Sequence, residues 1–169
     1  ESYFGHKWCN YWFHVHHLNT DTGKMSKSKG EFLTVSLLES KGYDPMAYRL
    51  FCLQSHYRRN LVFSWENLDN AAQTYEKLIA KIATLTPGTD VEETAFQALK
   101  ERFVGALNGD LNTSLAVTAV YDVLKAKTTD ATKLAALADF DRVPCLDLLK
   151  KVEEIRNKQA QEAAESADP

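Results

Sequence analysis

The sequence predicts a mainly α-helical protein, a helical bundle preceded by a short helix-strand segment. First, apolar residues recur every three or four positions along most of the chain from residue 34 onward, which places them on one face of a helix. Second, these stretches are bounded by residue types that begin and end helices. Third, only residues 13–17 alternate with the two-residue period of a strand, and almost no other strand is expected.

The N-terminal stretch, residues 1–19, is rich in aromatic side chains. We expect a short helix here, leading into a strand in which Phe13 and Val15 alternate with His14 and His16. An aromatic cluster in a soluble protein is more often part of a core than a surface on which nucleic-acid bases stack. The residues expected in a core on this basis are Trp8, Tyr11, Trp12 and Phe13.

Short polar residues predict where the first helices begin. Thr34 and Ser64 are N-cap types, and Asp44 precedes a proline at the first helical position. Gly42 is expected to end the first helix, because glycine readily adopts the left-handed conformation that follows a helix. The three helices are expected at residues 35–41, 46–55 and 65–85.

The second half continues the helical pattern. Asp90 and Glu93 have the spacing of a capping box, and Asn108-Gly109 is expected to end the helix that follows. Residues 111–127 are apolar nearly all round, which predicts a helix at the centre of the bundle. Further helices are expected at residues 130–140, from Pro144, and as a solvated tail over residues 151–169.

Composition excludes several classes of protein. The chain has 169 residues, of which 44% are hydrophobic and 25% charged, with a net charge of −3. These values are typical of a soluble globular protein, and no apolar run is long enough to cross a bilayer. The charge is uneven, +3 over residues 1–60 and −6 over residues 61–169. An anionic partner is therefore expected to meet the N-terminal part.

The cysteines and histidines do not predict a metal site. The three cysteines, Cys9, Cys52 and Cys145, lie far apart and form no CxxC pair, so neither a disulfide framework nor a zinc site is indicated. A reducing cytoplasm is expected, with Cys52 and Cys145 buried. His14 and His16 would share one face of a strand, but a closed zinc site needs about four ligands.

The stretch TGKMSKSKG, residues 22–30, contains three lysines and two serines within six residues. Lysine ammonium groups on flexible stems can reach nucleotide phosphates and neutralise charge that builds in a transition state. A solvated basic loop is the simpler interpretation, although it would not need a central methionine. The candidate residues are Lys24, Met25, Ser26, Lys27 and Ser28.

The motif KMSKS at residues 24–28 is the signature loop of class I aminoacyl-tRNA synthetases. The surrounding GKMSKSKGEFLT and the later run YRLFCLQSHYRRNLVFSWENLDNA resemble cysteinyl-tRNA synthetase. The resemblance covers residues 3 to about 150. It implies an internal or C-terminal fragment that begins just before the signature loop, with the nucleotide-binding H-I-G-H half and the zinc ligands upstream.

The resemblance also implies roles for individual residues. Lys27 matches the ATP-binding lysine of the family, and Lys24 is expected to act with it in catalysis. The rest of the ATP-binding loop is implied to be Met25, Ser26 and Ser28. Arg58 matches the arginine of the family's HYR stretch, and Arg58 and Arg59 are expected to contact nucleic acid. Lys29 and Glu31 depart from the family's usual leucine and asparagine.

The resemblance further implies a division of the chain. Residues 1–33 would end the catalytic domain, residues 34–63 would form the stem-contact region, residues 64–150 the tRNA-binding bundle, and residues 151–169 a solvated helical tail. The parent protein would be a cytoplasmic monomer with no membrane contact. It would use ATP with Mg²⁺ to activate cysteine and would transfer the cysteinyl group to the 3′ end of tRNA(Cys).

Two alternatives stay open on the sequence. The chain could be a non-catalytic helical module that binds tRNA or protein. It could also come from a paralogue that joins cysteine to a small amine, although such a protein would not need the long helical bundle.

Overall fold

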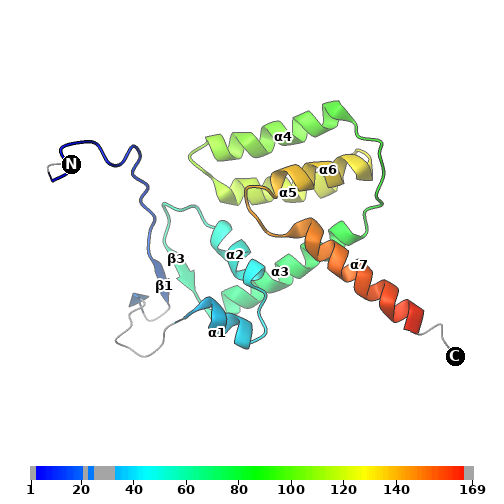
Figure 1. Ribbon diagram of the computed structural model, residues 1–169, viewed down its shortest axis with the longest axis horizontal. Helices are drawn as coiled ribbons and strands as arrows, with labels where there is room; N and C mark the ends of the chain where they lie inside the picture. Colours follow the sequence, from blue (N-terminus) through cyan, green and yellow to red (C-terminus); the bar gives the residue numbers. More distant parts are fainter. Residues whose placement is uncertain (1–2, 21–22, 25–32, 166–169) are drawn as a thin grey trace.

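The computed structural model describes residues 3–20, 23–24 and 33–165. A small sheet and α1 lie at one side of the molecule, and the longer helices form a bundle beside them (Figure 1). The elements are β1 (Leu18–Thr20), β2 (Gly23–Lys24), α1 (Val35–Ser40), α2 (Pro45–Leu53), β3 (Leu61–Phe63), α3 (Trp65–Ala83), α4 (Glu93–Asn108), α5 (Thr113–Lys125), α6 (Asp130–Phe140) and α7 (Leu148–Glu165). The expected mainly helical fold is confirmed. None of the described helices is both long and apolar enough to cross a membrane.

The predicted starts of the first three helices are confirmed. The side chain of Thr34 accepts a hydrogen bond from the backbone N–H of Leu37, and Ser64 does the same for Asn67, each at 3.1 Å. Asp44 accepts from the N–H of Met46 at 2.8 Å. Because these caps are local, the sequence alone is enough to place them.

The sheet has three strands in the order β2-β1-β3. β1 pairs antiparallel with β2 and parallel with β3, with Leu18 opposite Leu61 and Thr20 opposite Phe63. The expectation of almost no strand beyond the first is therefore wrong. The strand also starts later than predicted, at residue 18, and residues 13–17 form no strand.

Two hydrophobic clusters form the core, and α2 contributes to both. Ala47 and Leu50 face the large cluster, which α3 to α7 complete. Phe51 faces the small cluster together with Leu38 of α1 and Phe63 of β3. α4 packs against α5 and α6, and α3 packs against α2 and α7. α3 also contributes to both clusters, so α2 and α3 together connect the sheet to the bundle.

The helix expected at the N-terminus is absent from residues 3–17. The aromatic side chains predicted to lie in a core are 55% to 91% exposed, and they are Trp8, Tyr11, Trp12 and Phe13. A short helix is stable only when it buries an apolar face. This segment buries little surface against the rest of the described chain.

Two other helix starts differ from the prediction. α4 begins at Glu93 after Glu92, which makes no side-chain cap, so the Asp90 capping box is wrong. The backbone N–H of Glu92 donates instead to the hydroxyl of Thr132, which is fully buried, at 2.8 Å. α7 begins at Leu148 and not at Pro144.

The later start of α7 is explained by hydrogen bonds to the residue that follows α6. The carboxylate of Asp141 accepts hydrogen bonds from the N–H groups of Leu146 and Leu148 at 2.7 and 2.8 Å. Burial raises the pKa of this carboxyl, although these two hydrogen bonds favour its charged form. The expected solvated tail is mostly exposed, but Arg156 donates to the carbonyl oxygens of Ala83 and Leu85 at 3.2 and 2.6 Å.

Candidate functional site

A polar cluster joins the α2–β3 loop to the α4–α5 loop. The hydroxyl of Tyr57 donates to Oδ1 of Asp110 at 2.5 Å. Arg58 donates to both carboxylate oxygens of the same residue, from Nε at 2.7 Å and from Nη2 at 3.3 Å. Nε2 of His56 lies 3.0 Å from the carbonyl oxygen of Asp110. Asp110 thus contacts three consecutive residues of a loop more than fifty positions away in the sequence.

The charges in this cluster favour the ionised pair. The hydrogen bonds from Arg58 and then from Tyr57 lower the pKa of Asp110 to about 2. The same carboxylate raises the pKa of the Tyr57 hydroxyl and of the Arg58 guanidinium. The guanidinium also lies 5.0 Å from the centre of the Tyr57 ring, the geometry of a cation–π contact. The Arg58 charge is therefore largely matched by Asp110.

Arg59 differs from its neighbour. Its side chain is exposed, and no ion pair is found for it among the described residues. It lines a polar hollow of about 600 Å³ together with Arg58, His56 and Ser114. Both arginines predicted to contact nucleic acid are exposed and line this hollow, and Arg59 is the one without an ion pair among the described residues.

Arg59 also lines an apolar cavity of about 400 Å³. Phe13 and Val15 from the N-terminal segment line it, with Tyr48 and Cys52 from α2. Burial raises the pKa of Tyr48 to about 12 and also raises the pKa of the Cys52 thiol. Neither group ionises near neutral pH, so this cavity offers an apolar wall beside the cationic Arg59.

The same loop contacts the segment that leads into β1. The backbone N–H of His16 donates to the carbonyl oxygen of Tyr57 at 3.1 Å. The rings of Phe13 and Tyr57 have their centres 4.5 Å apart. β3 then begins at Leu61 and pairs with β1. The polar cluster is therefore connected to the sheet through Tyr57 and through the strand that follows it.

The lysine-rich stretch follows this sheet in the sequence. The backbone of Lys24 ends β2, which pairs with β1. Met25, Ser26, Lys27 and Ser28 lie outside the described residues, as do Lys29 and Glu31. Their predicted roles in ATP binding and catalysis stay predictions.

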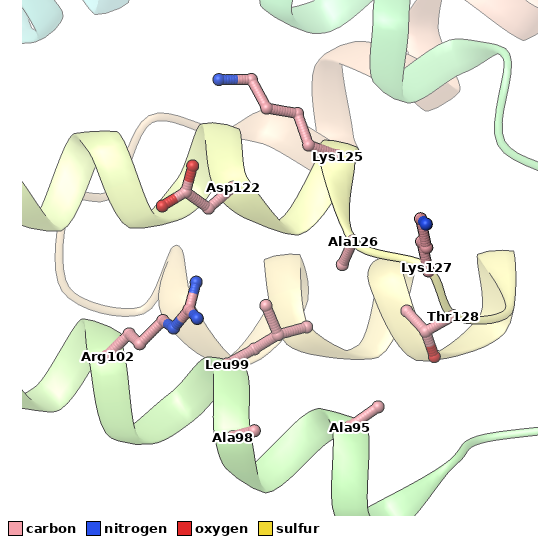
Figure 2. Close-up of a pocket in the computed structure, with 9 residues that line it drawn as sticks. All are labelled: Ala95, Ala98, Leu99, Arg102, Asp122, Lys125, Ala126, Lys127 and Thr128. Atoms are coloured by element: carbon pink, nitrogen blue, oxygen red, sulfur yellow. The ribbon is translucent and has the colours of Figure 1, made fainter.

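A second hollow, of about 340 Å³, lies between α4 and α5. Figure 2 shows Arg102 reaching from α4 toward the side of α5 that carries Asp122, while Lys125 points away from α4. Lys127 also lines the hollow. Three cations, Arg102, Lys125 and Lys127, and one carboxylate, Asp122, thus line this hollow.

No metal site is found in the part of the chain that the structure describes. Residues 3–20, 23–24 and 33–165 contain no group of three or more His, Cys, Asp or Glu side chains placed to hold an ion. His14, His16 and His17 are exposed. Cys52 is half-buried, whereas Cys145 is exposed, so the prediction that Cys145 is buried is wrong.

Asp110 is the site residue that the sequence analysis missed. It directly follows Asn108-Gly109, which were recognised only as a helix end. The sequence did contain a local indication of its conformation, because an Asp in a glycine-containing turn often adopts the left-handed conformation. Asp110 does so, with a φ of 62°. Its partners, Tyr57 and Arg58, could not be identified without the fold.

Comparison with known proteins gives one matching family model. Residues 1–73 match the model described as tRNA synthetases class I (C) catalytic domain. The matched region contains the lysine-rich stretch, all three strands, the α2–β3 loop and the first half of α3.

Curated relatives match a larger part of the chain. A cysteine–tRNA ligase from Novosphingobium aromaticivorans is 44% identical over 144 residues, covering 82% of this chain and 29% of the relative. Cysteine–tRNA ligase 1 from Burkholderia lata is 39% identical over 145 residues, covering 85% and 30%. A cysteine–tRNA ligase from Borreliella burgdorferi is 32% identical over 166 residues, covering 90% and 35%. The chain thus spans about a third of the length of these relatives.

Proposed function

The chain belongs to the class I cysteinyl-tRNA synthetase family, and on this premise we propose that it is part of a cysteine–tRNA ligase. It would supply the ATP-binding loop and a surface for tRNA. The observation that carries the proposal is the position of the KMSKS motif, residues 24–28, inside the region that matches the class I catalytic-domain model.

The proposed reaction has two steps. The carboxylate of cysteine attacks the α-phosphorus of ATP, which forms cysteinyl-adenylate and releases pyrophosphate. A ribose hydroxyl at the 3′ end of tRNA(Cys) then attacks the cysteinyl carbonyl, and AMP leaves. Lys27 and Lys24 would neutralise the charge that builds on the phosphates in the first step, because a cation aimed at developing charge lowers the barrier.

Serine hydroxyls of the loop would add hydrogen-bond donors to the same phosphates. Ser26 and Ser28 flank Lys27, and Met25 completes the motif. Mg²⁺ would accompany ATP as its counterion. Because the described residues hold no group of zinc ligands, any zinc site of the full-length protein would have to use other residues.

The tRNA would meet the chain on the surface around Arg59. The exposed guanidinium beside a polar hollow and an apolar cavity supports this placement. Phosphate contacts by arginine and lysine supply much of the affinity of proteins for nucleic acid. The helices from Ser64 to Leu149 would hold the body of the tRNA, with the protein acting as a monomer.

Pyrophosphate exchange tests the ATP-binding role. The full-length protein and its Lys27→Ala variant would be assayed for cysteine-dependent ATP–pyrophosphate exchange. Loss of one transition-state donor lowers the rate on the order of 10²-fold, so the variant is expected to fall by that factor. Lys77→Ala removes an exposed lysine of α3 and serves as the matched control.

An unchanged exchange rate in Lys27→Ala would remove the proposed role of Lys27. If the wild-type protein binds tRNA but catalyses no exchange with cysteine, a non-catalytic tRNA-binding module would replace the ligase as the function.

A further inference from the structure

We propose that Asp110 is a positioning residue that orients Arg59 toward RNA and ties the helical bundle to the sheet that carries the ATP-binding loop. This inference rests on the proposed function, because it concerns how the tRNA-contacting loop is held. It assigns to Asp110 no contact with a reacting atom.

The backbone of Asp110 is fixed to the bundle. It lies between α4 and α5 with a φ of 62°, and Leu111 follows with a φ of 51°. The N–H of Leu111 donates to the carbonyl oxygen of Leu107 at 2.8 Å, and that of Asn112 donates to Ala106 at 3.1 Å. These bonds close the turn on the end of α4, so the Asp110 carboxylate is presented from a defined place.

The side chain of Asp110 then fixes the loop that carries Arg59. It holds Tyr57 and Arg58 by three hydrogen bonds of 2.5 to 3.3 Å. The next residue, Arg59, donates its backbone N–H to the carbonyl oxygen of His56 at 2.9 Å. Arg58 is paired to the carboxylate, and the adjacent Arg59 is exposed.

The α2–β3 loop continues into β3 and also contacts the segment that precedes β1. Tyr57 accepts a hydrogen bond from His16, two residues before β1, and packs on the ring of Phe13. Apolar packing also joins the sheet to the bundle, since α2 contributes to both hydrophobic clusters. The Asp110 cluster adds a polar connection at the edge where Arg59 lies.

The charge of Asp110 is the property to remove in a test. Asn tolerates a positive φ as well as Asp does, so Asp110→Asn keeps the turn and weakens only the charged contacts. Glu154→Gln is the matched control, because Glu154 of α7 pairs with Lys151 at 3.4 Å and lies beyond the helices proposed to hold the tRNA. Its partner does not lie in the α2–β3 loop.

The experiment measures aminoacylation of tRNA with cysteine by the full-length protein. In Asp110→Asn the KM for tRNA is expected to rise about fivefold, which is near the largest effect that loss of an exposed ion pair usually has. Glu154→Gln is expected to stay within twofold of wild type. Cysteine-dependent pyrophosphate exchange needs no tRNA, and it is expected to stay within twofold in both variants.

A double-mutant cycle with Arg59→Gln separates positioning from general destabilisation. If Asp110 acts through Arg59, then Asp110→Asn has little further effect on the KM for tRNA in the Arg59→Gln background. Fully additive effects would overturn the proposal, and so would an unchanged KM in Asp110→Asn.

A second variant covers loss of folding. If Asp110→Asn does not fold, Tyr57→Phe keeps the ring contact with Phe13 and removes only the hydroxyl bond to Asp110. It should raise the KM for tRNA in the same Arg59-dependent way, and an unchanged KM would count against positioning. A wild-type protein without cysteine-dependent exchange would instead refute the proposed function, whatever the variants do.

Discussion

Leu50 tests whether α2 is an integral part of the bundle. Its side chain is fully buried in the large cluster, while Phe51 next to it faces the small cluster. Replacement by alanine removes the equivalent of about two to three methylene groups, which at about 0.8 kcal/mol each gives a transfer loss of about 2 kcal/mol. The cavity left behind raises the expected loss in free energy of unfolding to about 3–4 kcal/mol.

Urea denaturation followed by circular dichroism at a helix band measures this loss. Leu115→Ala is the matched control, because Leu115 lies in α5 with 54% of its surface exposed. Surface substitutions of this kind usually change stability by no more than about 0.5 kcal/mol. Equal losses in the two variants, or a loss below about 1 kcal/mol for Leu50→Ala, would show that α2 is not held in the bundle as the structure describes.

The remaining predictions concern two polar contacts. The folded-state pKa of Asp110 is about 2, below its ordinary value. Its stabilising effect is therefore full above the ordinary pKa of Asp and is lost as pH falls toward 2. In acid denaturation the difference in stability between wild type and Asp110→Asn should shrink over that range, and a constant difference would contradict the ion pair with Arg58. Tyr75→Phe removes the hydroxyl that donates to the carbonyl oxygen of Leu146 at 2.6 Å in a buried position, so thermal or urea unfolding should show a loss of about 1–3 kcal/mol, whereas no loss would mean that water replaces the hydroxyl.

Local signals account for the parts of the fold that the sequence predicted well. Thr34, Asp44 and Ser64 each cap a helix through a contact two or three residues away. The predicted helix at residues 130–140 matches α6 at both ends. Such features depend on neighbouring residues, so a single sequence contains enough information to place them.

Side-chain contacts that no helix-start pattern predicts account for two of the errors. The start of α4 depends on Thr132, some forty residues away, and not on Asp90. The start of α7 depends on the Asp141 carboxylate and not on Pro144. Thr132 reaches Glu92 only in the folded chain, whereas Asp141 lies close to its two partners in the sequence, at a spacing that the prediction did not consider.

The residues of the candidate site were also predicted only in part. The family resemblance identified Arg58, and Arg59 was expected to contact nucleic acid together with it. The structure separates them by their partners, because Arg58 pairs with Asp110 and Arg59 has no ion pair among the described residues, while both are exposed. Asp110 itself lies in a loop whose residues carry no recognisable motif, so its importance follows only from the contacts it makes.

The central proposal is that the chain belongs to an enzyme that activates cysteine. The most direct measurement is ATP–pyrophosphate exchange by the full-length protein, tested with each standard amino acid in turn. We predict exchange with cysteine alone. Exchange with a different amino acid, or no exchange from a folded protein, would contradict the proposed function.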